Sequence, residues 1–425
     1  MRARFLLALA AELLLFAALN LFDDWTLEIM PIKFVGVALL AGLAYLLAAS
    51  EFVHWRGGAV WIFWGATIAL RLLALPLAPA DETWRYQADG VIQRAGFDPY
   101  AVAPGDDRVT QRIPERARVP EADRPSAFAP GAEILFRGLR GGSFVGKLWF
   151  AAAELLAIGV LLRFVDLKTA AWLAWNPLLA YSFAGAGHFE SVVLLAIVAL
   201  LLCLVRMQQE EGKTRLYAFG AAVALGVAVS LRPVCLVLLL PTIFALRRRA
   251  WTLALGAVVP IFCALPFPRW PHGFYNLLGD FPKLTRLNDL FWWLIEETLV
   301  ANRHERFFRY DAVIVIVATL VGLAWWRHWQ RSFLWCLAVV VILTPVLHPW
   351  YLAWILPVAT WRRAFAWHFL SVTIFAYYLF YNERLFALPW HAEPWLRGMI
   401  LLPVLIVLGM LALRREEAPA EINEA

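Results

Sequence analysis

The chain has few charged residues for its length, and this scarcity excludes a soluble globular protein. Only 16% of its 425 residues are Asp, Glu, Lys or Arg, whereas 62% are hydrophobic and the mean hydropathy is +0.66. Soluble domains average about 45–50% apolar and about 25% charged residues. The apolar excess is spread along the whole chain, which predicts many membrane-spanning helices rather than one anchor.

Cysteine is also scarce, and its placement argues against a disulfide framework and against a metal site. All four cysteines lie inside apolar runs without ligand spacing, and the His, Asp and Glu residues form no such cluster either. The chain has no Gly-rich nucleotide loop, and membrane loops account for most of its net charge of +6. We therefore expect no metal, no cofactor and no nucleic-acid partner. The cysteines are Cys203, Cys235, Cys263 and Cys336.

Apolar segments long enough, or nearly long enough, to cross a bilayer recur from one end of the chain to the other. They predict an all-α, polytopic integral membrane protein with about 12–14 transmembrane helices. Residues 1–415 are expected to form one transmembrane domain, and 416–425 a disordered acidic tail. The segments are 5–22, 34–50, 59–79, 146–163, 169–184, 189–206, 216–231, 233–246, 251–267, 311–326, 332–346, 349–361, 365–381 and 398–413.

The distribution of Lys and Arg predicts the orientation. With the N-terminus inside, the short inner connections carry about seventeen Lys and Arg residues and the short outer ones about four. Both termini then face the cytoplasm of a bacterial plasma membrane, and two long connections, 80–145 and 268–310, face outward. Loops this long are usually functional or disordered, and residues 109–124 are expected to form a flexible lid.

Two adjacent carboxylates, Asp81 and Glu82, open the first outer loop at the edge of the membrane. Ionisable groups at this depth commonly have a function, and partial desolvation raises the pKa of a carboxyl toward that of a proton acceptor. The pair also fits a helix cap, because acidic residues are favourable in the first helical turn. A short amphipathic surface helix is predicted over 83–93, with Arg85, Tyr86, Asp89 and Gln93 at helical spacing.

Polar and aromatic residues also lie at the outer ends of later helices. His188 and Glu190 either cap the span that follows them or line the same outer cavity. Arg232 needs an anion, and a phosphate and a carboxylate fit it equally well. His348 is either a hydrogen-bonded structural residue or a ligand for a phosphate. Trp350 and Tyr351 are either interface aromatics or flat surfaces for a sugar or prenyl chain.

Three other cations are weaker candidates. Lys283 and Arg286 lie in the second long loop, where solvated charge is the commoner role and phosphate binding the alternative. Arg71, inside the third span, is expected either to extend toward the outer interface or to pair with Asp81.

The stretch Asp-Glu-x-x-Arg-Tyr-x-x-Asp-Gly at 81–90, followed by Gly-x-Asp-Pro-Tyr at 96–100, resembles the bacterial GT-C glycosyltransferases. The resemblance is to the polyprenyl-phosphate-mannose-dependent mannosyltransferase group in particular. Similar blocks occur at 187–191, at 287–291 and, as Thr-Pro-Val-Leu-His-Pro-Trp-Tyr-Leu, at 344–352. All of them lie on the outer side in the orientation given by charge. The departures are Ala88 for Trp, Asp98 for Asn, and Phe128-Ala129-Pro130 for Tyr-Pro-Pro.

This resemblance implies a GT-C fold with large outer loops and an inverting transfer of a hexose, mannose or a related sugar. The donor would be a polyprenyl-phosphate-linked sugar and the acceptor a glycan or glycolipid at the outer face. The first acid, Asp81, would act as general base, and Glu82 would orient the acceptor or supplement the base. The residues expected to bind substrates are Arg85, Tyr86, Asp89, Tyr100, His188, Glu190, Arg232, His348, Trp350 and Tyr351.

Two alternatives come from other classes of membrane protein. A transporter or flippase of lipid-linked sugars would carry charged or broken helices at the bilayer midplane. Here the polar residues concentrate in one outer loop and in nearby helix ends, which favours an enzyme. A ligase or phosphotransferase acting on whole lipid-linked glycans would be expected to have its largest outer loop late in the chain, whereas the largest here is early.

Overall fold

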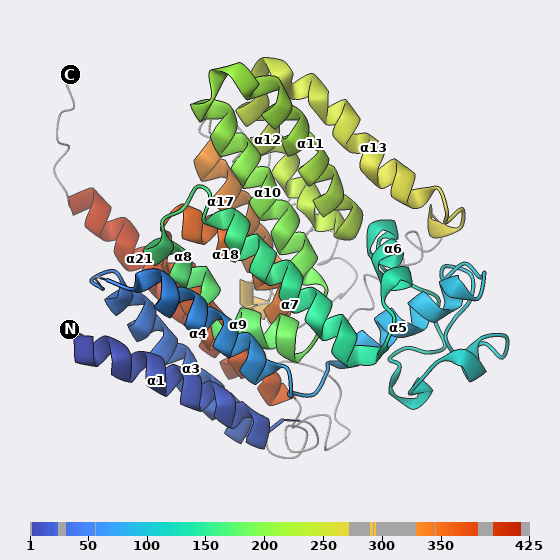
Figure 1. The fold of residues 1–425 in the computed structure, drawn as a ribbon, viewed down its shortest axis with the longest axis horizontal. Coiled ribbons are helices and arrows are strands. Elements are labelled where there is room, and N and C mark those ends of the chain that lie inside the picture. The colour runs from blue at the N-terminus through green and yellow to red at the C-terminus, as the bar shows by residue number, and fades with distance from the viewer. Residues whose placement is uncertain are drawn as a thin grey trace.

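The computed structural model describes residues 2–23, 31–55, 57–271, 290–291, 293–294, 329–344, 346–380 and 394–417. In these residues every regular element is a helix (Figure 1), so the predicted all-α polytopic membrane fold is confirmed. Each predicted apolar segment consists largely of helix, except 311–326, which lies outside the described residues.

Five helical segments of the described chain are long and apolar enough to cross a membrane. They are α1 with η1 (Arg2–Leu21), α3 (Pro31–Phe52), α7 (Gly142–Leu161), α10 (Glu190–Gln209) and α11 (Thr214–Leu231). Shorter apolar helices are α4 (Ala59–Ala74), α17 (Trp329–Leu343), α19 (Ala366–Thr373) with η10 (Ile374–Phe380), and α21 (Pro394–Glu417).

The remaining elements connect or cover these helices. At one end of the bundle lie α5 (Asp81–Arg94), η2 (Thr110–Arg112), η3 (Arg116–Arg118) and α6 (Pro130–Gly138). Along the bundle and in its connections lie α8 (Leu167–Ala174), α9 (Pro177–Ala180), η4 (Tyr181–Gly185), η5 (Glu211–Lys213), η6 (Pro233–Leu238), α12 (Leu239–Leu246), η7 (Arg247–Thr252), α13 (Leu253–Ala264), η9 (Pro349–Tyr351) and α18 (Leu352–Trp361).

The predicted segment 169–184 is a broken helix. Asn176 lies between α8 and α9 and caps α9, since its side-chain oxygen accepts hydrogen bonds from the amides of Leu178 (3.0 Å) and Leu179 (3.3 Å). Pro177 follows at the first helical position, where its missing N–H leaves no donor unsatisfied. The chain then widens into the π-helical turn η4. The broken segment from α8 to η4 therefore ends shortly before α10 begins.

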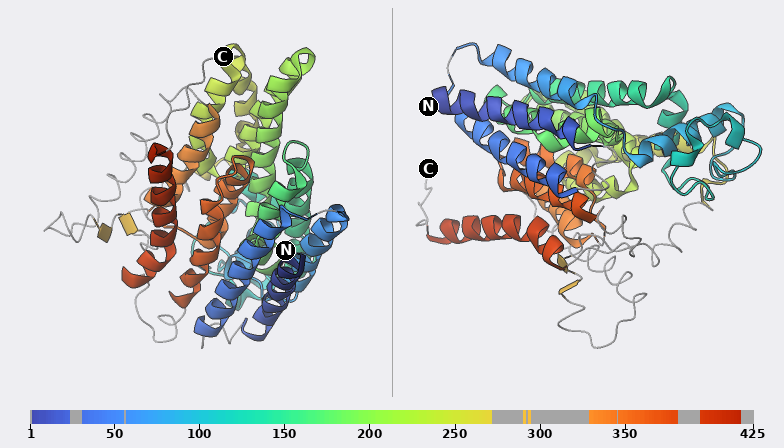
Figure 2. Two further views of the ribbon diagram at one scale, coloured as in Figure 1. Left: turned by 90° about the vertical axis from the view of Figure 1, so that its left-hand side faces the viewer. Right: turned by 90° about the horizontal axis from the view of Figure 1, so that it is seen from below.

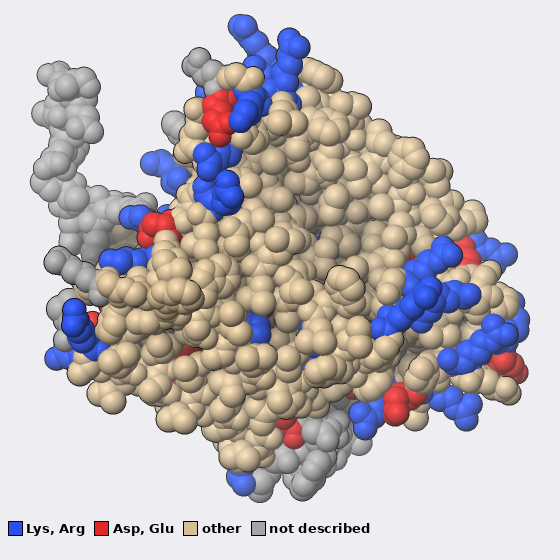
Figure 3. Space-filling model, in the orientation of Figure 1, with Lys and Arg blue, Asp and Glu red and all other residues tan. Residues whose placement is uncertain are grey.

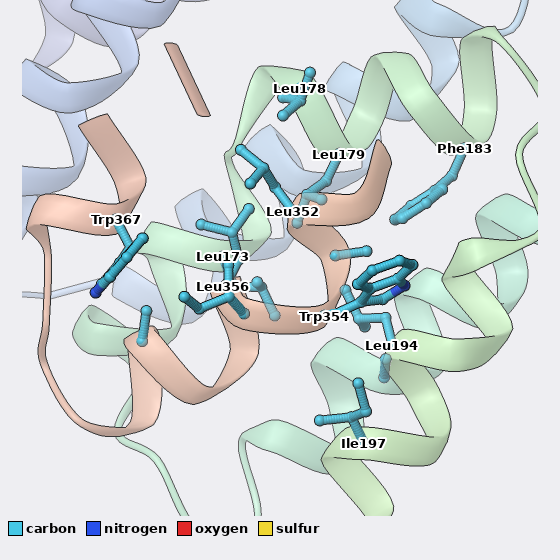
Figure 4. Packing of buried hydrophobic residues seen from close by; sticks show 14 of the residues in the cluster. Leu173, Leu178, Leu179, Phe183, Leu194, Ile197, Leu352, Trp354, Leu356 and Trp367 are labelled. Atoms are coloured by element: carbon cyan, nitrogen blue, oxygen red, sulfur yellow. The ribbon is translucent and has the colours of Figure 1, made fainter. Parts of the chain in front are cut away.

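The core is centred on α18, which is apolar on all sides and is surrounded by other helices. Figure 4 shows Leu352, Trp354 and Leu356 of this helix packed among Leu178 and Leu194 of neighbouring helices. A helix that is hydrophobic all round is buried in the interior of a bundle. Because α18 directly follows the 344–352 motif, this packing holds the motif in a fixed place.

An ion pair inside the bundle gives Arg71 a partner that the sequence did not predict. Arg71 of α4 donates through Nε to a carboxylate oxygen of Glu154 of α7 at 3.0 Å, and its NH2 contacts the other oxygen. Its NH1 donates to the carbonyls of Thr67 (3.1 Å) and Ala174. The expectation that Arg71 extends outward or pairs with Asp81 is therefore wrong. A buried arginine needs the nearest available carboxylate, and Glu154 supplies it from the facing helix.

The two ends of the bundle differ. Helices α5 and α6 project from one end, whereas the start of α1 and the C-terminal end of α21 lie at the opposite end (Figures 1 and 2). Lys, Arg, Asp and Glu gather mostly toward these two ends, with a broad uncharged belt between them (Figure 3). This is the distribution expected of a protein whose middle lies in lipid.

Residues 97–125 form a compact layer on the outer side of α5, which we call the outer layer. Val109 is fully buried and Val119 nearly so, and both pack with Ala88 and Ile92 of α5 in a small hydrophobic cluster separate from the main core. The stretch 109–124, which the sequence suggested as a lid, therefore has its own apolar contacts with α5 in this structure.

Candidate active site

The start of α5 is tied to the segment that precedes α10. The amide of Ala80 and the hydroxyl of Thr83 both donate to the carbonyl of Ala186, each at 2.8 Å. Gly187 has a φ of +81°, and a Cβ there would lie 2.9 Å from the Thr83 Oγ1. A side chain at this position would be strained and would push α5 away. The two acids of α5 are therefore held beside the start of α10.

Glu190, at the start of α10, and Arg232, just after the end of α11, form an ion pair. The Arg232 Nε donates to the Glu190 Oε1 at 3.0 Å, and the Arg232 NH2 contacts the same oxygen. The Glu190 side chain is fully buried, whereas 20% of the Arg232 side chain is exposed. The other carboxylate oxygen, Oε2, has no hydrogen-bond partner among the described residues. The described residues therefore satisfy only part of the hydrogen-bonding capacity of this ion pair.

Aromatic rings surround the Arg232 guanidinium. Its central carbon lies 4.6 Å from the ring centroid of Phe189, 5.6 Å from that of Tyr351 and 5.9 Å from that of Phe128. The faces of aromatic rings attract a cation and exclude water, but they do not neutralise its positive charge. Arg232 therefore presents a positive charge at the edge of an apolar surrounding, where it attracts an anion more strongly than in water.

His348 and His188 both stack on Trp350. The Trp350 ring centroid lies 3.7 Å from that of His188 and 4.6 Å from that of His348, with interplanar angles of 19° and 5°. The His348 Nδ1 is 2.9 Å from the Tyr377 hydroxyl, which fixes the orientation of the ring. Neither ring nitrogen of His188 has a hydrogen-bond partner among the described residues. The motif at 344–352 and the one at 187–191 therefore meet in one place.

Burial keeps both imidazoles neutral. Desolvation lowers the pKa of His348 to about 3, and the nearby charge of Arg232 adds to the effect. Desolvation likewise holds the pKa of His188 well below its usual range, with smaller contributions from His348 and Arg232. A neutral imidazole can donate one hydrogen bond and accept another, but it adds no positive charge. Arg232 is therefore the cation of this cluster.

The Glu82 carboxyl lies within the electrostatic reach of the same cluster. The residue keeps part of its surface exposed, yet desolvation by its surroundings raises its pKa to about 7. Its own backbone hydrogen bond opposes the rise, Asp81 and Glu190 add to it, and Arg232 lowers it. Such a carboxyl is poised near neutral pH, where a group can accept a proton efficiently.

Three predicted substrate ligands bond to neighbouring protein groups. Arg85 pairs with Asp89 at 3.0 Å, both side chains are buried, and Arg85 also donates to the carbonyl of Arg124 in the outer layer at 2.9 Å. The Tyr100 hydroxyl donates to the carbonyl of Phe128 at 2.6 Å. Arg85 therefore ties the outer layer to α5, and Tyr100 ties that layer to the backbone of Phe128. Tyr86 faces the Arg232 cluster, because its ring packs on Phe136, Phe128 and Phe189.

Several residues of this region were not singled out from the sequence. Phe128 and Phe189 flank Arg232, Tyr377 orients His348, and Lys147 donates to the carbonyls of Leu75 (2.6 Å) and Leu77 (2.5 Å) just before α5. A lysine in a segment that otherwise reads as apolar was the one available signal. The aromatic residues had none, because 15% of the chain is aromatic.

Some predictions lie outside the described residues. They are Lys283, Arg286, most of the block 287–291, and most of the interfacial helix expected over 288–298. Among the described residues no group of three or more His, Cys, Asp or Glu side chains could hold a metal ion. The expectation of a metal-free reaction stays a prediction.

The chain is similar to the alpha-(1->6)-mannopyranosyltransferase A of Mycobacterium tuberculosis (strain ATCC 25618 / H37Rv). The two are 24% identical over 393 aligned residues, which cover 78% of this chain and 71% of the relative. No family model matches the chain, and no solved structure matches it. The similarity agrees with the resemblance to GT-C mannosyltransferases drawn from the motifs, and it supports a glycosyltransferase.

Proposed function

We propose that the protein is a membrane glycosyltransferase that transfers a hexose, mannose, from a polyprenyl-phosphate-linked donor to an acceptor at the outer face of the plasma membrane. The observation that carries the proposal is that Arg232 lies 5.6 Å from the ring of Tyr351 in the 344–352 motif and interacts electrostatically with both Glu82 and His348. The mannosyltransferase relative and the motif resemblance support the choice of sugar and donor.

Arg232 would hold the phosphate of the donor. A guanidinium has five N–H donors and stays charged at every physiological pH. Glu190 engages Nε and one terminal nitrogen of Arg232, and the exposed fifth of the side chain gives an anion access. The same contacts would stabilise the leaving phosphate as its negative charge grows in the transition state.

The neutral His348 would position the sugar, and the stacked ring of Trp350 would hold its imidazole in place. An imidazole held by Tyr377 can exchange hydrogen bonds with a sugar hydroxyl or a phosphate oxygen. The indole face of Trp350, stacked between two imidazoles, keeps one orientation. A fixed ring and a fixed hydrogen-bonding group confine the anomeric carbon to one position, which favours in-line attack.

A carboxylate of the Asp81–Glu82 pair would accept the proton of the attacking hydroxyl, and attack opposite the phosphate would invert the anomeric centre. Both acids begin the helix that the Ala186 carbonyl anchors beside this cluster. The positive-inside distribution supports an outer position for α5, with both termini in the cytoplasm. A lipid-linked donor suits that location, because nucleotide sugars are confined to the cytoplasm.

The test is transfer by the purified full chain in bilayers. We expect labelled mannose to pass from a polyprenyl-phosphate donor to extracted membrane acceptors, and none to pass from nucleotide-linked mannose. R232Q is expected to lower turnover about 10²–10³-fold by removing charge stabilisation. Arg206→Gln is the matched control, because Arg206 pairs with Glu210 on the far end of α10 at 3.5 Å.

Two results would contradict the proposal. Absence of transfer from any lipid-linked sugar would exclude the enzyme. Movement of the intact lipid-linked sugar across vesicles without transfer would favour a flippase instead. Equal losses in R232Q and the Arg206→Gln control would remove Arg232 from the site.

A further inference from the structure

The two acids that open α5 lie on different faces of the helix. This inference rests on the proposed function and asks which acid takes the proton. Residues four or seven apart share a helix face, so Asp81 shares one with Arg85 and Ala88, and Glu82 shares another with Tyr86 and Asp89. Adjacent helical residues diverge by about 100°. The contacts of the later residues therefore show where each acid is directed.

The face that begins with Asp81 is turned toward the outer layer. Arg85 pairs with Asp89 and donates to the carbonyls of Glu121 and Arg124, both at 2.9 Å. Ala88, on the same face, is fully buried against Val109 and Val119, so residues 97–125 cover this face for two turns. A carboxylate at its first position lies on the outer-layer side of the helix.

The face that begins with Glu82 is turned toward the bundle. Tyr86 stacks on Phe136 of α6 at 4.5 Å and meets Phe189, beside α10, at 5.4 Å. One turn later, a Cβ on Gly90 would lie 2.3 Å from the Phe136 carbonyl oxygen, so α6 touches the helix backbone here. Phe189 is the ring that lies under Arg232. The face of Glu82 therefore leads to the ion pair.

Glu82 also interacts electrostatically with residues of the Arg232 cluster. Its carboxyl interacts with Glu190 and Arg232. Burial raises the pKa of Tyr351 in the 344–352 motif, and the charge of Glu82 contributes to this rise. Helical side chains incline toward the N-terminus of their helix, which points Glu82 from the first turn toward the segment that Ala80 and Thr83 anchor. The position of Glu82 on the helix and its electrostatic interactions therefore both indicate that its carboxyl is directed toward the Arg232 cluster.

We propose that Glu82, not Asp81, is the general base of the transfer. The acceptor oxygen forms the bond to the anomeric carbon while its hydrogen passes to a carboxylate oxygen of Glu82. The bond between the anomeric carbon and the phosphate oxygen breaks, and its electron pair leaves with the polyprenyl phosphate. That product gains one negative charge, which Arg232 faces, and the protonated Glu82 later releases its proton to water. Asp81 positions α5 against the outer layer.

The experiment compares E82Q, E82D, D81N and D106N by steady-state transfer from mannosyl-phospho-polyprenol between pH 5 and 9. Asp106 is a partly exposed acid of the outer layer paired with Arg108 at 2.7 Å, so D106N removes a charge nearby without changing α5. We expect E82Q to lower kcat about 10²–10⁴-fold with little change in donor KM. It should also abolish the rise in kcat through about pH 7 that the pKa of Glu82 predicts for the wild type. Thermal unfolding confirms that each variant is folded.

The remaining variants separate the two acids. E82D keeps a carboxylate and is expected to recover part of the turnover with the pH dependence intact. D81N is expected to keep the rise through about pH 7 even where its turnover is lower, and D106N should match the wild type. If D81N loses the rise in kcat, or if E82Q retains it, the base is Asp81 and the inference is overturned. Either result would leave the proposed function standing. Absence of transfer by the wild type would instead overturn the proposed function.

Discussion

Two buried Arg–Glu pairs among the described residues of the bundle differ in how completely their hydrogen bonds are satisfied. In the pair of Arg71 and Glu154, both carboxylate oxygens receive hydrogen bonds, and the remaining guanidinium nitrogen donates to two backbone carbonyls. Only 3% and 1% of the two side chains are exposed. Every strong partner that Arg71 needs is supplied by the protein.

In the pair of Arg232 and Glu190, both contacts go to one oxygen, and the second oxygen has no partner among the described residues. A fifth of the Arg232 side chain is exposed, and the groups beside it are aromatic faces rather than carbonyls. The same two residue types thus build a closed structural link in one place and an open cationic site in the other. Completeness of hydrogen bonding, more than burial, distinguishes a structural pair from a candidate binding site.

Breaking the closed pair should have the largest effect. R71L leaves Glu154 buried without its partner, and we expect a loss of about 3–5 kcal/mol of stability, measured as poor recovery and a lower Tm in detergent. The double variant R71L/E154L removes both charges and should recover most of the loss. A single variant that unfolds at the wild-type Tm would show that the pair contributes no stability.

Breaking the open pair should reduce activity more than stability. R232Q removes the cation that faces the donor phosphate, so the expected loss of about 10²–10³-fold falls on kcat. Its Tm should fall less than that of R71L, because part of the Arg232 side chain is already in contact with solvent. Comparable Tm losses in both variants, with transfer retained in R232Q, would remove the distinction between the two pairs.

Loss of the stacked indole should have a smaller effect. W350A removes two ring contacts, each worth about 0.5–1.5 kcal/mol, so kcat/KM is expected to fall about tenfold. W350F keeps an aromatic face between the imidazoles and should retain most of the activity. If both variants lose the same amount, the indole N–H matters rather than the ring face.

The smallest effect should come from Glu133 of α6, which bonds to Ser126 directly after the outer layer. Glu133 is fully buried and accepts from Gln93 at 2.6 Å and from Ser126, and burial together with the charge of Asp89 raises its pKa well above the usual range. The folded protein therefore keeps a proton on Glu133 that the unfolded chain releases near its ordinary pKa of about 4.3. Its stability should decline as pH rises above that value.

Limited proteolysis of residues 97–125 measures this effect. We expect faster cleavage at pH 9 than at pH 6 in the wild type, and little pH dependence in E133Q, which keeps the side-chain shape without the titrating proton. Equal cleavage of the wild type at both pH values would show that Glu133 does not couple protonation to the layer. Sugar transfer should change little in E133Q.

The sequence predicted most of the fold, because hydrophobic segments in a membrane protein must become helices to satisfy their backbone. Its patterns also selected residues that come together, since Glu82, His188, Glu190, Arg232 and His348 are near one another although they lie far apart in the chain. It did not predict which residues lie on which face of α5. Arg85 and Asp89 share the motif with Tyr86, but whether a helical face meets the bundle or the outer layer depends on tertiary packing.

Partners of buried charges were also beyond the sequence. Glu154 is the only acidic residue in the run from 146 to 163, but the sequence does not show that it pairs with Arg71, because pairing depends on the rotation of α7 relative to α4. The position of Lys147 at the end of α7 likewise gains its meaning from the carbonyls of the turn before α5. The helical period predicts which face of its own helix a residue occupies, but it does not predict which residue of another helix lies opposite.

The separate hydrophobic cluster of the outer layer has a consequence for how such enzymes diversify. Val109, Val119 and their neighbours pack on α5 without joining the main core, so we expect changes at these apolar positions to leave the membrane bundle intact. In the proposed orientation, an acceptor approaching from outside the cell would meet this layer first. We expect the layer to be exchangeable between related chains, with the acceptor preference following the exchanged segment while the sugar and the lipid carrier stay the same.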